Sequence, residues 1–125
     1  MKSILLSSLT KVFKDVEPNF DEFTEFSVLR GEVFNFQIAI FPQTDEDCNI
    51  TVEVASNLRD GIKVYKVLNM PSTCAAPDDH DDFHYDTKRT EYPDLLQPIN
   101  EDYSVELTKG EWNCLWFKYI MQIIF

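Results

Sequence analysis

Two histidines four positions apart are the residues of this chain with the clearest potential for chemistry. The run His80-Asp81-Asp82-Phe83-His84 would place both imidazoles on one face of a helix, with Asp81 where a zinc protease has its general-base glutamate. Aspartate disfavours helix, however, and no third metal ligand is evident. We therefore expect a solvated acidic loop. A loosely held divalent cation is the alternative, because hard oxygen ligands cluster here.

A second acidic run, from Asp45 to Ile50, begins like a calcium-binding loop. It lacks the glycine of position six, where Ile50 stands, and the bidentate glutamate of position twelve, where Ser56 stands. Carboxylate pairs are abundant elsewhere, but no pattern indicates the cleft that would raise a carboxyl pKa for glycoside hydrolysis. We expect no catalytic residue, no cofactor and no metal site in this chain.

Aromatic side chains near the end of the chain are the remaining candidates for a site. Trp112 and Trp116 are four residues apart in an expected strand, so both indoles share a face that could stack on a sugar. Leu115 and Phe117 make the opposite face apolar too, and a strand apolar on both sides is usually buried on both sides. We expect core and interface contacts; a glycan site that includes Tyr92 is the alternative.

The elements that would position these residues have the periodicity of strands. From Val33 to Phe41, apolar and polar residues alternate, which indicates a half-buried strand with Asn35 and Gln37 on its outer face. A similar run at 49–54 follows a polar turn, so the two are predicted to form a hairpin. Further strands are expected at 4–9, 11–13, 62–68, 103–107 and from Trp112 onward, with an edge strand or a single helical turn within 21–29.

The stretch from Met70 to Asn100 differs from the rest of the chain. It contains four of the six prolines and many acidic residues, which predicts one long acidic loop. The short strands on either side recur at roughly 8–12-residue spacing, without a helical period. The sequence therefore predicts an all-β protein: a single antiparallel β-sandwich of the immunoglobulin or jelly-roll kind over residues 1–125.

Composition limits the classes of partner. The 125 residues include 22 Asp and Glu against 11 Lys and Arg, and the net charge of −11 disfavours nucleic acid and anionic membranes. No window approaches the roughly 20 apolar residues of a membrane span, and no signal sequence is evident, so we expect a cytoplasmic protein. The three cysteines (Cys48, Cys74 and Cys114) are expected to be reduced; one disulfide plus a free thiol is the alternative.

Short motifs distributed over most of the chain occur in a familiar order. They are Ser8-Leu9-Thr10-Lys11-Val12-Phe13, the segment 29–37, Tyr92-Pro93-Asp94-Leu95-Leu96, and Trp112 with Leu115-Trp116. Their order resembles the N-terminal β-sandwich of family 123 glycoside hydrolases. A departure is Lys88-Arg89-Thr90-Glu91, where a glycine-containing turn would normally stand.

The resemblance implies a function for the chain. Members of that family are β-N-acetylgalactosaminidases whose catalytic carboxylates come from a (β/α)₈-type barrel, with assistance from the acetamido group of the substrate. No residue here matches that catalytic pair, so the chain would not be an enzyme by itself. The resemblance implies an accessory domain for a glycoside hydrolase catalytic domain. A carbohydrate-binding module that recognises glycans through Trp112, Trp116 or Tyr92 is the alternative.

The C-terminal segment suggests a second kind of partner. The apolar residues 119–125 are expected to end before the sandwich is complete, which would leave the last strand as an open edge. Open edges and exposed apolar patches pair with other chains. We therefore expect self-association through 117–125 as an alternative to a catalytic-domain partner.

Overall fold

The computed structural model describes residues 1–18, 27, 29, 31–55, 61–71 and 91–120. These residues confirm the all-β prediction: they form strands, turns and loops, and contain no helix long and apolar enough to cross a membrane. The strands are β1 (Lys2–Ser7), β2 (Val33–Phe41), β3 (Cys48–Thr51), β4 (Ile62–Pro71), β5 (Glu91–Pro98), β6 (Ser104–Leu107) and β7 (Asn113–Ile120).

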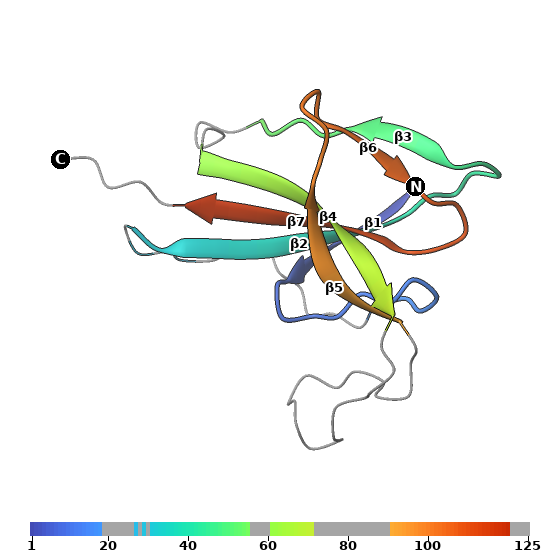
Figure 1. Ribbon diagram of the computed structural model, residues 1–125, viewed down its shortest axis with the longest axis horizontal. Coiled ribbons are helices and arrows are strands. Elements are labelled where there is room, and N and C mark those ends of the chain that lie inside the picture. The colour runs from blue at the N-terminus through green and yellow to red at the C-terminus, as the bar shows by residue number, and fades with distance from the viewer. Residues whose placement is uncertain (19–26, 28, 30, 56–60, 72–90, 121–125) are drawn as a thin grey trace, which may run out of the picture.

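The strands form two antiparallel sheets (Figure 1). The larger sheet has the order β1-β2-β7-β4-β5, and the smaller consists of β3 and β6. The consecutive pairs β1-β2 and β4-β5 are neighbours in the larger sheet, whereas β3 and β6 each leave that sheet to form the smaller one. The result is a sandwich-like arrangement that is not closed into a barrel.

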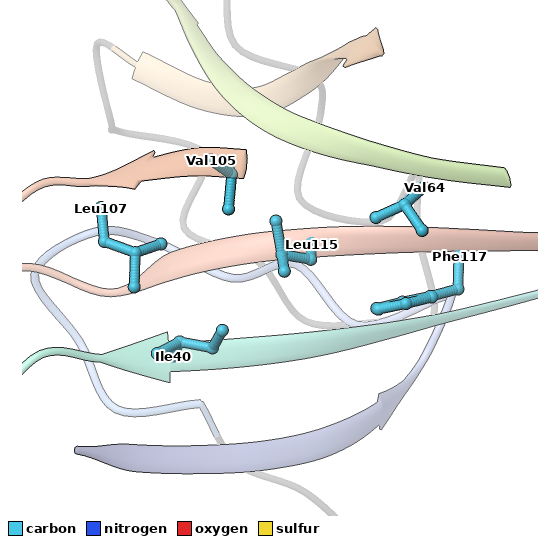
Figure 2. Close-up of a cluster of buried hydrophobic side chains, with 6 residues drawn as sticks. All are labelled: Ile40, Val64, Val105, Leu107, Leu115 and Phe117. Atoms are coloured by element: carbon cyan, nitrogen blue, oxygen red, sulfur yellow. The ribbon is translucent and has the colours of Figure 1, made fainter. Parts of the chain in front are cut away.

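A hydrophobic core fills the space between the two sheets. β2, β4 and β7 direct alternate side chains toward the small sheet, as the period of two requires, and β6 contributes Val105 and Leu107 from above (Figure 2). The rings of Phe36 and Phe117, which face each other across β2 and β7, stack with centroids 5.0 Å apart. The buried members are Ile40, Val64, Val105, Leu107, Leu115 and Phe117.

The opposite face of the large sheet is buried as well. A second cluster there consists of Leu6, Val12, Ala39, Trp112 and Cys114. Val12 belongs to the irregular segment that follows β1, so this segment covers the second face where a helix or a sheet would otherwise be needed. Both faces of β2 and β7 are therefore shielded from solvent at the centre of the sheet.

Two predictions about strand pairing are wrong. β2 and β3 do not form a hairpin, because β2 pairs with β1 and β7 whereas β3 pairs with β6. The last strand is not an open edge: β7 is the central strand and pairs with β2 on one side and β4 on the other. A largely apolar strand is stable at this place because both neighbours and both covering layers exclude water.

The expected loop from Met70 to Asn100 is shorter than predicted. β4 continues to Pro71, and β5 occupies Glu91–Pro98, so only the residues between them (72–90) could form it, and they lie outside the described residues. β5 tolerates two prolines because it is an edge strand, where a missing N–H need not break a ladder. The predicted strand at 11–13 is irregular, and most of the expected edge element at 21–29 also lies outside the described residues.

Candidate functional site

Trp112 lies immediately before β7 and is only 8% exposed. Its indole packs against the ring of Phe41 at 5.3 Å between centroids, and the ammonium group of Lys2 lies 5.9 Å from its centre. Its backbone N–H donates a 2.7 Å hydrogen bond to the carbonyl of Lys14. These contacts leave little of the ring available to stack on a ligand.

Tyr92 is buried on the edge strand β5, with 6% of its surface exposed. The ring of Phe13 meets it edge-on, with centroids 6.1 Å apart and an interplanar angle of 67°. Such T-shaped pairs are a favourable packing geometry for aromatic rings. Like Trp112, Tyr92 therefore contacts the segment that follows β1 rather than solvent.

Trp116 is half-buried and shares a face of β7 with Trp112 and Cys114, as the spacing predicted. Its indole N–H donates a 3.1 Å hydrogen bond to Oδ1 of Asn35 on the neighbouring strand β2. The polar edge of the indole is thus fixed by the sheet. The three predicted aromatic residues do not form one exposed, coplanar platform, because two of them are covered.

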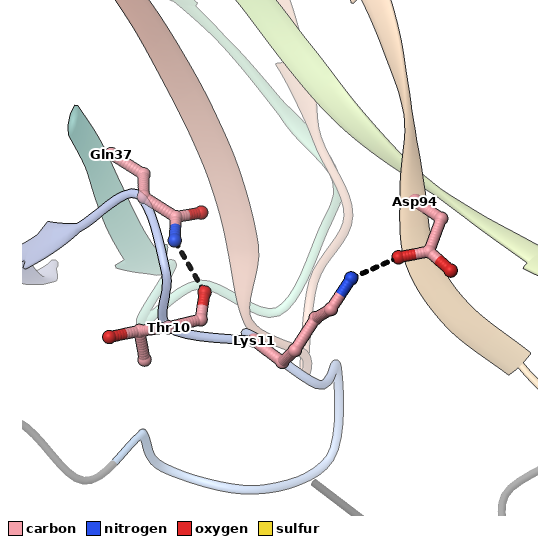
Figure 3. Close-up of polar contacts among 4 residues, drawn as sticks. All are labelled: Thr10, Lys11, Gln37 and Asp94. Atoms are coloured by element: carbon pink, nitrogen blue, oxygen red, sulfur yellow. Dashed lines mark hydrogen bonds and ion pairs between the residues drawn. The ribbon is translucent and has the colours of Figure 1, made fainter. Parts of the chain in front are cut away.

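Ion pairs connect the segment that covers Trp112 and Tyr92 to the edge strand β5. Lys11 forms an ion pair with Asp94 on β5 (Figure 3), and Lys14 forms a second with Glu91 at 2.7 Å. The hydrogen bond to Glu91, together with its negative charge, raises the pKa of Lys14. Both pairs are exposed to solvent, which screens their charges and weakens their contribution to stability. We call residues 8–17 the covering segment.

The sequence did not indicate the role of Gln37, a buried polar residue that hydrogen-bonds to the covering segment. Gln37 was expected on an outer face, but only 3% of it is exposed. Its amide nitrogen donates to the carbonyl oxygens of Ser7 and Thr10, and its carbonyl oxygen accepts a hydrogen bond from the thiol of Cys114. A glutamine in a strand that is buried on both faces would have indicated this role. The alternation of apolar and polar residues predicted burial of only one face, so the role of Gln37 could not be recognised from the sequence.

Asn113 is a second buried polar residue that the sequence did not reveal. Its Oδ1 accepts a hydrogen bond from the backbone N–H of Thr108 at 2.9 Å, while its Nδ2 donates to the carbonyls of Thr108 and Glu111, each at 3.0 Å. The side chain thereby closes the turn between β6 and β7. This fixes the point where Trp112 enters the core.

The described residues offer no metal site, and one of their two free thiols is unreactive. No group of three or more His, Cys, Asp or Glu side chains in the described part of the chain could hold a metal ion. The thiols of Cys48 and Cys114 are free, but burial raises the pKa of Cys114 to about 12, which keeps it protonated and unreactive. His80, His84 and Cys74 lie outside the described residues.

Neither a protein-family model nor a curated protein matches the chain.

Proposed function

We propose that this chain is a non-catalytic accessory β-sandwich domain that braces a glycoside hydrolase catalytic domain. The resemblance of its motifs to the N-terminal sandwich of family 123 enzymes suggests the partner. The observation that favours a bracing role over glycan binding by the predicted aromatics is the burial of Tyr92 and Trp112 beneath the covering segment. Rings that are covered in this way are not accessible to a sugar.

Other features of the chain agree with this proposal. The free thiols of Cys48 and Cys114 suit the reducing cytoplasm, which remains its predicted location. Leu95 and Leu96, on the edge strand β5, are 42% and 41% exposed, and they are the apolar contacts proposed for the catalytic domain. Self-association through 117–125 has less support, because β7 already pairs on both sides and 121–125 lie outside the described residues.

The proposal is tested by mixing the purified chain with a separately purified family 123 catalytic barrel. We expect the chain alone to release no product from an aryl β-N-acetylgalactosaminide, and we expect it to raise the melting temperature of the barrel by several degrees. The double variant Leu95→Ser, Leu96→Ser should lose this effect while its own melting temperature stays close to that of the parent. Hydrolysis by the chain alone would refute the proposal, and so would a melting temperature of the barrel that does not change when the chain is added.

A further inference from the structure

A surface notch lies where β5 ends and the chain crosses to the smaller sheet. β5 pairs with β4 only as far as Tyr65, opposite Pro98. The first three residues of β4 therefore pair with β7 on one side and, within the described residues, with no strand on the other. The resulting cavity has a volume of about 470 Å³, within the range of roughly 300–1,000 Å³ typical of small-ligand sites. Its lining includes Ile62, Lys63, Tyr65, Asn100, Glu101 and Tyr103.

Tyr103 lines this notch in a backbone conformation that L residues rarely adopt. Its φ is +61°, a left-handed value that is energetically costly for a residue other than glycine. Two hydrogen bonds hold it there: its N–H donates to the carbonyl of Asn100 at 2.9 Å, and its carbonyl accepts from the N–H of Val52 at 2.8 Å. Because the residue is 55% exposed, burial of the ring offsets little of that cost. The fold alone would be served better by glycine or asparagine.

Side chains of the same turn hold Tyr103 in place. Oδ1 of Asp102 accepts hydrogen bonds from the backbone N–H of Ser104 at 3.1 Å and from its hydroxyl at 2.6 Å, and these bonds lower the pKa of Asp102. Nδ2 of Asn100 donates to the carbonyl and the hydroxyl of Ser104 at 3.2 and 3.1 Å. The turn is thus ordered before any ligand arrives, which reduces the entropy cost of binding.

The chemistry of the lining selects the class of ligand. Tyr65 and Tyr103 provide aromatic rings with phenolic hydroxyls, whereas Asn100, Glu101 and Lys63 provide donors and acceptors around them. The opposite charges of Lys63 and Glu101 balance, and the net charge of −11 disfavours anions. A compound with an apolar C–H face and a rim of neutral hydroxyls satisfies both the rings and the polar groups.

We propose that this notch binds a neutral saccharide of one or two pyranose rings. Tyr103 stacks on the sugar face, and the polar lining residues hydrogen-bond to its hydroxyls. This site differs from the aromatics Tyr92, Trp112 and Trp116. It does not depend on the bracing role, since it needs no catalytic domain.

The test is a ¹H–¹⁵N NMR titration of the intact chain with the methyl β-glycosides of glucose, galactose and N-acetylgalactosamine. At least one should produce saturable shifts at the amides of 62–65 and 100–104, with little change around Trp112. Tyr103→Gly should weaken that binding by at least about tenfold, the loss expected from one stacking ring of about 1.4 kcal/mol. Its fold should persist because glycine accepts the positive φ. Tyr103→Phe, which keeps the ring, should stay within about threefold of the parent.

Three results would overturn the proposal. They are the absence of shifts with all three glycosides at tens of millimolar, undiminished binding by Tyr103→Gly, and, in a parallel titration, tighter binding of methyl glucuronide than of methyl glucoside. Each can occur whether or not the chain stabilises a catalytic barrel, so the two proposals fail independently.

Discussion

The thiol of Cys114 donates a 3.0 Å hydrogen bond to Oε1 of Gln37 across two adjacent strands, and both residues are almost fully buried. The amide nitrogen of Gln37 donates in turn to the carbonyls of Ser7 and Thr10 (Figure 3 shows the bond to Thr10). One side chain therefore connects β7, β2, the end of β1 and the covering segment. Because the bond to Cys114 is buried and the bonds to Ser7 and Thr10 are partly buried, the group is costly to leave half-satisfied.

Gln37→Ala should lower the free energy of unfolding by about 2–4 kcal/mol, since it leaves a cavity and deprives the carbonyls of Ser7 and Thr10 of their donor. Urea denaturation measures the change. The exposed Gln97 supplies the matched control, and Gln97→Ala should stay within about 0.5 kcal/mol of the parent. Equal effects of the two substitutions would show that the Gln37 amide contributes nothing beyond a surface residue.

The stability of the chain should fall at alkaline pH in a way that depends on Cys114. Its pKa is raised by burial from 9.0 to about 12, so below pH 9 the thiol is protonated in both states and contributes no pH dependence. Between these values the unfolded chain loses the proton and the folded chain retains it. The free energy of unfolding then decreases with rising pH, by up to about 1.4 kcal/mol per unit.

Urea unfolding at several values between pH 7 and pH 10.5, compared with the variant Cys114→Ala, isolates this contribution from the titration of lysines and tyrosines. The parent should lose stability more steeply than the variant above pH 9. Parallel curves for the two proteins would contradict a buried, protonated thiol. Alkylation of the native chain at pH 8 should likewise leave Cys114 unmodified, as judged by peptide mass spectrometry.

Trp112→Ala should be among the most destabilising substitutions in the chain, with a loss of about 3–5 kcal/mol, because it empties the contact with Phe41 in a buried cluster. Trp116→Phe should cost only about 1 kcal/mol, since a half-buried ring is retained and one hydrogen bond to Asn35 is lost. Urea midpoints give the order of the two effects. A mild Trp112→Ala variant with weakened sugar binding would indicate a glycan platform instead.

Gly61→Ala should destabilise the start of β4 by about 1–3 kcal/mol. A Cβ there would lie 3.0 Å from the carbonyl oxygen of Ile120 and 3.0 Å from the ring of Tyr119, and the backbone oxygen cannot move aside easily. Gly110→Asn is the control, because nothing lies within 4 Å of a Cβ at Gly110 and asparagine tolerates its φ of +70°. Thermal melts that rank Gly110→Asn as the worse of the two would contradict this packing.

The positions of the strands could be predicted from the sequence better than their pairing. Alternation identifies which side chains of β2 share a face, but it carries no information about the strand that lies alongside, so the hairpin of β2 with β3 was wrong. Pairing across the chain is decided by burial of both faces of β7, which requires it to be central. β5 was missed because its prolines and acids are typical of loops, and only its edge position reconciles them with a strand.

The candidate site was predictable only in part. The shared face of Trp112 and Trp116 followed from their spacing, whereas the covering of Trp112 and Tyr92 depends on a segment with no regular structure. The left-handed φ of Tyr103 leaves no local sequence signal, because nothing in its residue type indicates such a conformation.

The measurement that most directly tests the structural role of the predicted aromatics is acrylamide quenching of the single tryptophan in a Trp116→Phe variant. The fluorescence of Trp112 should be quenched several-fold less in the native chain than in urea, and added N-acetylgalactosamine should leave the quenching unchanged, because the covering segment already shields the ring. Native quenching as strong as in urea, together with protection by the sugar, would contradict the account and make Trp112 a glycan-binding residue.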